Sequence, residues 1–441
     1  GFTIRLAKEA WTCGGVHHLS APLRWGGSNR AIHRMVGRVT TSHIDERAVR
    51  FPLGAAVTLD ALDADPYRVL ARLRESEPVT WVPETQMWFV TRRADQIAIL
   101  RDGERFTTDA DRSTIRDIFG RHMMTTDGDE ALRYKRSCLH AFRADVLARE
   151  MLPWVEKRAV ALLDAAGRHT STGPAEWEIM ADVATPLAVD SALYVLGLPL
   201  EFADRITEWF ADFAVALANF SGDPDTRTRG KAAAEAFAEA VVPQIRSASI
   251  EDRGLLAHLA TRGEDRLEDE EIISNALIML FGGIETTASM IGNTVWSVLA
   301  NELWQWLDED RARLSGVIEE SLRWQPAVQS ITRHTRCDME LEGVSISKGE
   351  VVQCMIGGAN RDPSHFSEPD DFDPERTNAG DHLSFGTGRH LCLGALLARI
   401  EVAAVLNGLA KRAPALAFEG AAVPPLTGYE FRRPAELRVH G

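Results

Sequence analysis

The longest periodic segment of this chain covers residues 267–302, LEDEEIISNALIMLFGGIETTASMIGNTVWSVLANE. Ile273, Leu277, Leu280 and Ile284 fall on one stripe in it, which is the spacing of an amphipathic helix. Acidic residues crowd the start of the segment, where the positive end of the helix dipole favours them. The segment therefore predicts one long helix with an apolar face.

Helical patterns also dominate residues 92–260 and 310–324, whereas residues 79–93 alternate and turn like a small hairpin. Short strands are expected within 339–354. There is no internal repeat and no linker that separates two cores. We therefore predict a single domain at 49–441, mainly α with small β-sheets, preceded by an N-terminal extension of unknown role at 1–48.

The net charge of −15 over 441 residues disfavours nucleic acids and anionic membranes as partners, because their phosphates would be repelled. No run of eighteen apolar residues is present, so no membrane span is expected. The five cysteines are widely spaced and form no CxxC pair, which excludes a zinc ribbon or a thioredoxin-type motif. Reduced thiols in the cytoplasm are the expectation.

A cysteine framed by glycines stands out in HLSFGTGRHLCLGALLARIE, residues 382–401. An apolar helix is expected directly after Cys392, and the unpaired N–H groups of a helix start favour a thiolate. A thiolate is the form that ligates metals and attacks electrophiles. Glycines on both sides allow the backbone to turn sharply around the sulfur.

A second motif, FGGIETT at 281–287, interrupts the long helix. Two adjacent glycines cost about 1 kcal/mol each in a helix interior relative to alanine, so they require a reason. Close helix packing is the simplest one. The polar Glu285 and Thr286 that follow favour another: Gly282 leaves room for a flat cofactor, and the Thr286 hydroxyl bonds a carbonyl of the preceding turn.

A third motif, EESLRW, places Glu320 and Arg323 three residues apart on one helix face. Any surface helix offers such pairs, so this signal is weak by itself.

The cysteine loop matches the pattern F-G-x-G-x-H-x-C-x-G at every fixed position. This resembles the haem-ligand loop of the cytochrome P450 family, the haem-thiolate monooxygenases. The other two motifs are similar to the oxygen-binding helix and the E-x-x-R pair of that family and occur in family order. The resemblance extends from about Asp65 to the C-terminus and implies the cytochrome P450 fold, with the cofactor between the long helix and the cysteine loop.

The resemblance also implies haem b (iron protoporphyrin IX) with Cys392 as its axial ligand. Thr286 would hydrogen-bond dioxygen at the iron, and Glu285 would help to relay protons. Glu320 and Arg323 would form a structural ion-pair network with Arg376. The other cofactor-binding residues would be Phe385, Gly386, His390, Gly394, Arg333 and Lys135, and the substrate pocket would include Gly282, Ile284, Val328, Ile331 and Thr427. Ala131 stands where the family commonly has a His that contacts the haem.

The function implied is insertion of one oxygen atom from O₂ into a small or mid-sized organic substrate, with secondary-metabolite tailoring favoured. Only 49 residues follow Cys392 (441 − 392), so a ferredoxin and its reductase are the expected electron donors. Arg133, Lys135, Arg136 and Arg389 are candidates for a basic docking patch. Two alternatives stay open: a peroxide-driven or non-oxygenating haem-thiolate enzyme, and a non-catalytic haem sensor or electron carrier.

Overall fold

The computed structural model describes residues 46–111, 113–169, 174–219, 222–261 and 266–441. The expected N-terminal extension at 1–48 therefore lies almost entirely outside the described residues, and so does Cys13.

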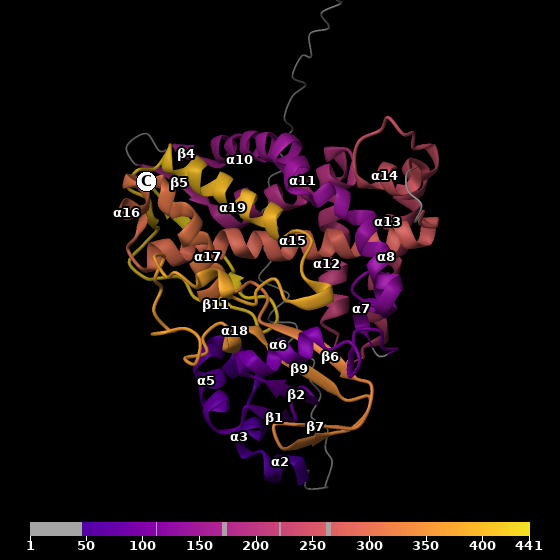
Figure 1. The fold of residues 1–441 in the computed structure, drawn as a ribbon. Coiled ribbons are helices and arrows are strands. Elements are labelled where there is room, and N and C mark those ends of the chain that lie inside the picture. The colour runs from indigo at the N-terminus through magenta and orange to yellow at the C-terminus, as the bar shows by residue number, and fades with distance from the viewer. Residues whose placement is uncertain (1–45, 112, 170–173, 220–221, 262–265) are drawn as a thin grey trace, which may run out of the picture.

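Helices make up most of the described chain (Figure 1). Those before the long central helix are α2 (Glu46–Arg50), α3 (Pro52–Ala55), α4 (Leu59–Ala64), α5 (Pro66–Ser76), α6 (Arg93–Arg101), α7 (Thr114–Phe119), α8 (Gly128–Leu139), α9 (Ala144–Val146), α10 (Leu152–Ala166), α11 (Thr185–Leu196), α12 (Ala203–Leu217), α13 (Pro224–Ser247) and α14 (Leu255–Thr261). The central helix and those after it are α15 (Asp269–Ala300), α16 (Trp304–Glu309), α17 (Leu314–Trp324), α18 (Ile356–Ala359) and α19 (Ala395–Ala410).

Helix α15 crosses the helical layer and packs against α11, α17 and α19. It begins with a capping box, in which the side chains of Glu268 and Glu271 each accept a hydrogen bond from the other's backbone N–H. It is long and apolar enough to cross a membrane, but 61% of its apolar window is buried inside the fold. Among the described residues it therefore serves as the core helix of the domain.

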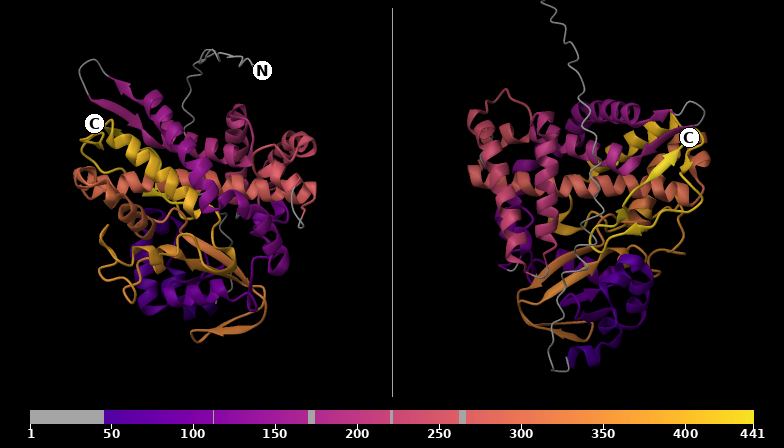
Figure 2. Two further views of the ribbon diagram at one scale, coloured as in Figure 1. Left: turned by 45° about the horizontal axis from the view of Figure 1, so that its top comes forward. Right: turned by 180° about the vertical axis from the view of Figure 1, so that it is seen from behind.

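The main sheet lies at the opposite end of the molecule from α10 and α19 (Figures 1 and 2). Its strands are β1 (Val79–Val82), β2 (Met87–Val90), β3 (Phe106–Thr107), β6 (Ser330–Thr335) and β9 (Val351–Met355), in the order β1-β2-β9-β6-β3. The pair β2–β9 is parallel and the others are antiparallel. Strand β6 carries residues from this sheet to the space below α15.

Three smaller sheets complete the fold. One has four strands, β4 (Arg168–His169), β5 (Ala175–Glu178), β10 (Ala417–Phe418) and β13 (Arg438–His440). The other two are the pairs β7 (Met339–Leu341) with β8 (Val344–Ile346), and β11 (Leu426–Thr427) with β12 (Arg433–Pro434).

The predicted fold class is confirmed, as are the long helix, the hairpin at β1–β2 and the strands within 339–354. The prediction recognised a break in the helical pattern at 165–176 but missed the strands β4 and β5 there. The register of β5 is set by β13, where Val439 pairs with Trp177. Such a partner lies too far along the chain for local periodicity to reveal it.

Candidate active site

The cysteine loop joins the short turn Gly388–His390 to the start of α19. The backbone N–H of Cys392 donates to the carbonyl of Phe385 at 3.0 Å, which closes the loop. Gly386 and Gly388 have φ values of 68° and 76°, a region that favours glycine. A Cβ on Gly388 would lie 2.8 Å from the carbonyl oxygen of Leu100, so only glycine allows the loop to pass α6 this closely.

Opposing influences act on the pKa of the Cys392 thiol. Burial raises the pKa of the Cys392 thiol, and this outweighs the lowering by the backbone N–H groups of Gly394 and Ala395 and by the positive charge of Lys135. The helix start acts in the expected direction but does not prevail over desolvation. A coordinating metal would add a positive charge next to the sulfur and lower the pKa of the thiol.

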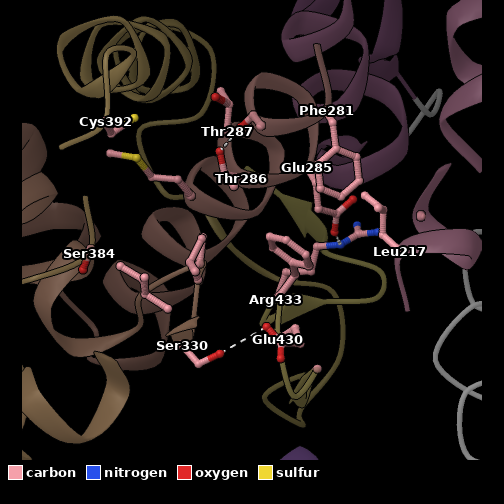
Figure 3. A pocket seen from close by; sticks show the side chains of 18 of the residues that line it. Leu217, Phe281, Glu285, Thr286, Thr287, Ser330, Ser384, Cys392, Glu430 and Arg433 are labelled. Atoms are coloured by element: carbon pink, nitrogen blue, oxygen red, sulfur yellow. Dashed lines mark hydrogen bonds and ion pairs between the residues drawn. The ribbon is translucent and has the colours of Figure 1, made fainter. Parts of the chain in front are cut away.

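Cys392 lines a cavity of about 3100 Å³ between α15, the cysteine loop, β6 and the β11–β12 hairpin. Pockets for drug-sized ligands occupy roughly 300–1,000 Å³, so this volume has room for a large cofactor together with a substrate. Figure 3 shows Cys392 and Thr286 approaching the cavity from different elements. Apolar side chains beyond them include Phe281 and Leu217, which lie near the ion pair of Glu285 and Arg433.

Helix α15 presents its glycines to this space. A Cβ on Gly282 or Gly283 would meet no other atom within 4 Å, so close helix packing does not explain them. The Thr286 hydroxyl donates to the carbonyl of Gly282, one turn earlier. This is the bond that the sequence predicted, and it uses the hydroxyl proton and leaves the oxygen able to accept.

Adding a side chain at Gly282 should have opposite effects on stability and binding. Gly282→Ala is expected to raise the free energy of unfolding by about 0.5–1 kcal/mol, because alanine is the better helix former. The methyl group would project into the cavity and weaken the binding of bulky ligands there. Chemical denaturation and ligand titration of the same variant check both effects. Gly292→Ala is the contrasting variant, since its Cβ would meet the Met180 sulfur at 2.3 Å and should destabilise the fold.

Glu285 points away from the Cys392 side of the cavity. Its carboxylate pairs with the guanidinium of Arg433 on β12 at 2.9 Å, as Figure 3 shows, and both side chains are 15% exposed. The acid predicted as a proton relay is therefore part of an ion pair. A role in proton transfer requires this pair to open or a water to connect it to Thr286.

Two groups that line the cavity could bind the anionic edge of a cofactor, Arg333 and His390. Arg333 is buried, lines the cavity and donates to the carbonyl of Thr332 at 2.8 Å, and among the described residues no carboxylate forms an ion pair with it. His390 Nε2 lies 3.2 Å from the Asp127 carboxylate. Burial would raise the pKa of Asp127, but hydrogen bonds from His390, Thr107 and Arg336 hold it far below its ordinary value.

Lys135 lines the cavity and contacts the cysteine loop. Its ammonium donates to the carbonyls of Arg389 at 2.9 Å and Leu391 at 2.8 Å, so it ties α8 to the cysteine loop. Burial lowers the pKa of Lys135, against a raising effect of Cys392. The basic patch also changes, because Arg133 pairs with Glu271 on α15. Of the four predicted docking residues, Arg136 and Arg389 are the exposed ones.

The predicted structural network is present in the described fold. Arg323 on α17 donates two hydrogen bonds to Glu320, at 2.6 and 2.7 Å, and both side chains are fully buried. Arg376 adds a third contact to Glu320 at 3.2 Å. Arg323 also donates to the carbonyls of Asn360, Pro369 and Asp371, which fixes the long loop before the cysteine.

The prediction that Ile284 lines the pocket is wrong. Ile284 is 1% exposed, packs in the core on the far side of α15 and does not line the cavity. It follows Gly283 by one residue, a turn of about 100° around the helix, which carries its side chain away from the cavity. Gly282, Val328, Ile331 and Thr427 do line the cavity, as do Phe385, Gly386 and Gly394.

Among the ionisable cavity residues that sequence reasoning missed are Glu401, Glu430 and Arg433. Burial raises the pKa of Glu401 to about 8, although Ser191 and Thr287 lower it. Glu401 is the sole acid of the apolar helix α19, and that isolation was a usable signal. No local signal marked Glu430 or Arg433, because the hairpin that holds them has no strong pattern.

The donor set fits a haem better than a metal ion bound directly by the protein. Among the described residues no group of three or more His, Cys, Asp or Glu side chains is placed to hold a metal. A single thiol suits a metal whose other ligands come from a cofactor. The size of the cavity, the bare face at Gly282 and Gly283, and the buried Arg333 agree with a flat, anionic macrocycle.

The family model described as Cytochrome P450 matches residues 310–411. Nocardicin C N-oxygenase of Nocardia uniformis subsp. tsuyamanensis is 31% identical over 408 residues, which cover 88% of this chain and 98% of that protein. The biotin biosynthesis cytochrome P450 of Bacillus subtilis (strain 168) is 30% identical over 343 residues, 75% of this chain and 84% of that protein.

Solved crystal structures of similar proteins have the same fold. The crystal structure of CalO2 matches with a TM-score of 0.77 and 31% identity, over 88% of this chain and 98% of that one. The structure of P450BioI in complex with an acyl carrier protein ligated to hexadec-9Z-enoic acid matches with a TM-score of 0.77 and 28% identity, over 87% of this chain and 100% of that one.

Proposed function

Because the chain belongs to the cytochrome P450 family, we propose that it is a monooxygenase that inserts one oxygen atom from O₂ into a small or mid-sized organic substrate, with Cys392 as the axial ligand of haem b. The observation that carries this proposal is the position of Cys392 in a large cavity that α15 also lines with Gly282 and Thr286. The overall reaction takes a C–H bond, O₂, two electrons and two protons to an alcohol and water.

Haem, when bound, supplies the activation of O₂, and thiolate ligation increases the electron density at the iron. The side chains of the protein would bind the haem and orient the substrate. Cys392 Sγ would ligate the iron, and Arg333 and His390 would serve as hydrogen-bond donors to the propionates. For His390 this requires that it exchange or share its contact with Asp127. The apolar side chains of Phe281 and Leu217 position the substrate and exclude water.

Thr286 Oγ1 has the position to hold a proton at the reaction centre. The hydroxyl lines the cavity and is oriented by its bond to the carbonyl of Gly282. Glu285 supplies protons to it only when the contact with Arg433 opens or a water bridges the gap. Glu401, with its raised pKa, is a second acid on the cavity wall.

Thr286→Ala is therefore expected to separate electron consumption from product formation. General acid–base groups contribute about 10²–10⁴-fold, so product per electron should fall by about tenfold or more, while oxygen is still consumed. Thr286→Ser keeps the hydroxyl and should retain most of the coupling. Simultaneous oxygen-electrode and product measurements check this, and equal loss in both variants would contradict a proton role.

We further propose that a ferredoxin and its reductase in the cytoplasm supply the electrons. Arg136 and Arg389 are exposed, and Arg389 belongs to the cysteine loop, so a negatively charged donor has two cations to contact. The rate of reduction by a ferredoxin should fall as ionic strength rises, because the Debye length shrinks from about 10 Å at 0.1 M to 3 Å at 1 M. Stopped-flow reduction over a salt series measures this, with Arg136→Gln expected to flatten the dependence. A reduction rate independent of salt would show that Arg136 and Arg389 do not form a docking patch.

The experiment that tests the function is incorporation of labelled oxygen from O₂ into product by the haem-loaded protein with a ferredoxin system. The reduced protein with carbon monoxide should show the red-shifted Soret band of thiolate ligation. Faster turnover with peroxide than with electron donors would favour a peroxide-driven enzyme instead. Haem binding without turnover on any substrate would favour a sensor or electron carrier.

Substrate use in secondary-metabolite tailoring is supported by the relatives. One of them is named nocardicin C N-oxygenase. Another, a cytochrome P450 of solved structure, is named together with the bacillaene polyketide synthase of Bacillus subtilis. We extend only the type of role to this chain, not those substrates.

A further inference from the structure

A carboxyl group on the cavity wall has no part in the proposed chemistry. Glu430 lies in the hairpin between β11 and β12 and lines the cavity. Its Oε2 accepts a hydrogen bond from Ser330 Oγ at 3.1 Å, and its Oε1 accepts one from Gln353 Nε2 at 2.8 Å. Figure 3 shows the contact with Ser330 on the opposite side of the view from Cys392.

The groups that hold this carboxyl are themselves buried and linked. Gln353 is 0% exposed and Ser330 is 5% exposed. Gln353 Nε2 also donates to Ser330 Oγ at 2.7 Å, and the Tyr429 hydroxyl donates to Gln353 Oε1 at 2.5 Å. Strands β6 and β9 thus fix Glu430 in one orientation from behind, which is a preorganised arrangement rather than a mobile surface acid.

No protein cation neutralises this carboxyl among the described residues. Arg433, the nearest arginine on β12, pairs with Glu285, and Arg432 donates to the carbonyls of Asp63 and Ala64. Burial raises the pKa of Glu430, and only neutral donors lower it. A buried carboxylate without a cation is costly, so the cavity side of Glu430 favours a ligand that brings a positive charge.

The residues near Glu430 indicate what the uncharged part of such a ligand would contact. Phe431 follows Glu430 and also lines the cavity, with its ring 6.0 Å from that of Phe281. Acidic residues add to the attraction for cations, because Asp60 and Glu84 line the same cavity and Asp63 binds the backbone N–H of Gly428, two residues from Glu430. Positive groups line the cavity as well, but Arg433 pairs with Glu285, Arg438 lies 3.5 Å from Glu436, and Lys135 donates to carbonyls of the cysteine loop.

We propose that Glu430 is a specificity-determining residue that binds a protonated amine on an otherwise apolar substrate, with Ser330 and Gln353 positioning its carboxylate. This deepens the proposed function and rests on it, since the amine would anchor the molecule while its apolar part extends towards the haem. The substrate class is an amphipathic organic base.

The test compares two ligands of the same shape on the haem-loaded full-length protein. Dimethyl(phenylbutyl)amine carries the cation at neutral pH, and the tertiary alcohol of matching skeleton is neutral. Isothermal titration calorimetry should give an affinity for the amine at least about tenfold higher, which is the lower range for a hydrogen bond to a charged group. Glu430→Gln should remove this preference and leave the affinity for the alcohol within about twofold.

Glu436→Gln is the matched control. Glu436 also lines the cavity, but its side chain is 57% exposed and lies 3.5 Å from Arg438, so water and a cation already compensate it. Its loss should leave the amine preference intact. If both variants weakened amine binding equally, the preference would come from the overall negative potential of the cavity and not from a local site. If Glu430→Gln lost affinity for the amine and the alcohol equally, Glu430 would have a structural role. A wild-type protein that does not bind or does not prefer the amine overturns the proposal.

The carbon monoxide spectrum of the same preparations keeps the two proposals separate. A thiolate-type Soret band without amine preference rejects the role of Glu430 alone. Amine preference without that band rejects the monooxygenase function while the binding result is still read by calorimetry.

Discussion

Cys392→His is expected to retain a haem-sized site but to lose monooxygenase activity by about 10³-fold or more, which corresponds to roughly 4 kcal/mol in the activation free energy. The reason is the ligand: an imidazole nitrogen does not supply the electron density of a thiolate. In the presence of carbon monoxide the reduced variant should lack the red-shifted Soret band and show one typical of a nitrogen ligand.

The control for this substitution is Cys337→Ala, because Cys337 is an exposed thiol that does not line the cavity. That variant should keep both the spectrum and the turnover of the wild type. A Cys392→His protein with an unchanged spectrum would mean that another group ligates the iron, and the assignment of Cys392 would then be wrong.

Loss of the Glu320–Arg323 pair is expected to have the largest effect on stability. Glu320→Gln or Arg323→Ala should lower the free energy of unfolding by about 3–5 kcal/mol, because removal of one partner leaves a buried charge without compensation. Arg323 is the more severe site, since it also holds three carbonyls of the loop that precedes the cysteine. Denaturant titration followed by circular dichroism measures the loss.

A pair with the same sequence spacing provides the comparison. Arg105 and Asp102 are also three residues apart, but the Arg105 side chain is 49% exposed. Arg105→Ala should cost about 0–1 kcal/mol, because solvent screens such a pair. If both substitutions had similar small effects, the buried network would not be the structural anchor that its geometry indicates.

The three motifs were readable from the sequence because each depends on short-range geometry. The glycines around Cys392 follow from a loop that turns sharply and passes close to α6. The spacing of Glu320 and Arg323 follows from one helical turn. Thr286 and Gly282 are four residues apart and meet through the same periodicity. The two helical pairs each lie within one element, and the sharp turn of the cysteine loop is local as well, so the sequence pattern reveals all three. The passage of that loop past α6 is a tertiary contact that the sequence alone does not show.

Packing between distant segments decided which other side chains line the cavity and which groups they contact. The family resemblance implied a pocket position for Ile284, but its side chain is buried in the core with residues of α11, α12 and α13. Arg433 reaches Glu285 across 148 residues (433 − 285), and Ser330 and Gln353 meet Glu430 from two other strands. No periodicity links such distant positions, because their contact depends on how the hairpin of β11 and β12 is placed beneath α15.

By itself, then, the sequence determined the fold class, the thiol and the helix that faces it, because hydrophobic spacing and glycine geometry act over a few residues. Only the tertiary structure decided the electrostatics of the cavity. Desolvation raises the pKa of Cys392 and Glu430, and it depends on every atom packed around them and not on their neighbours in the chain. The residues of the cysteine loop are thus recognisable from the local sequence, whereas the pKa of its thiol and the carboxyl group that would select a substrate depend on how distant segments pack.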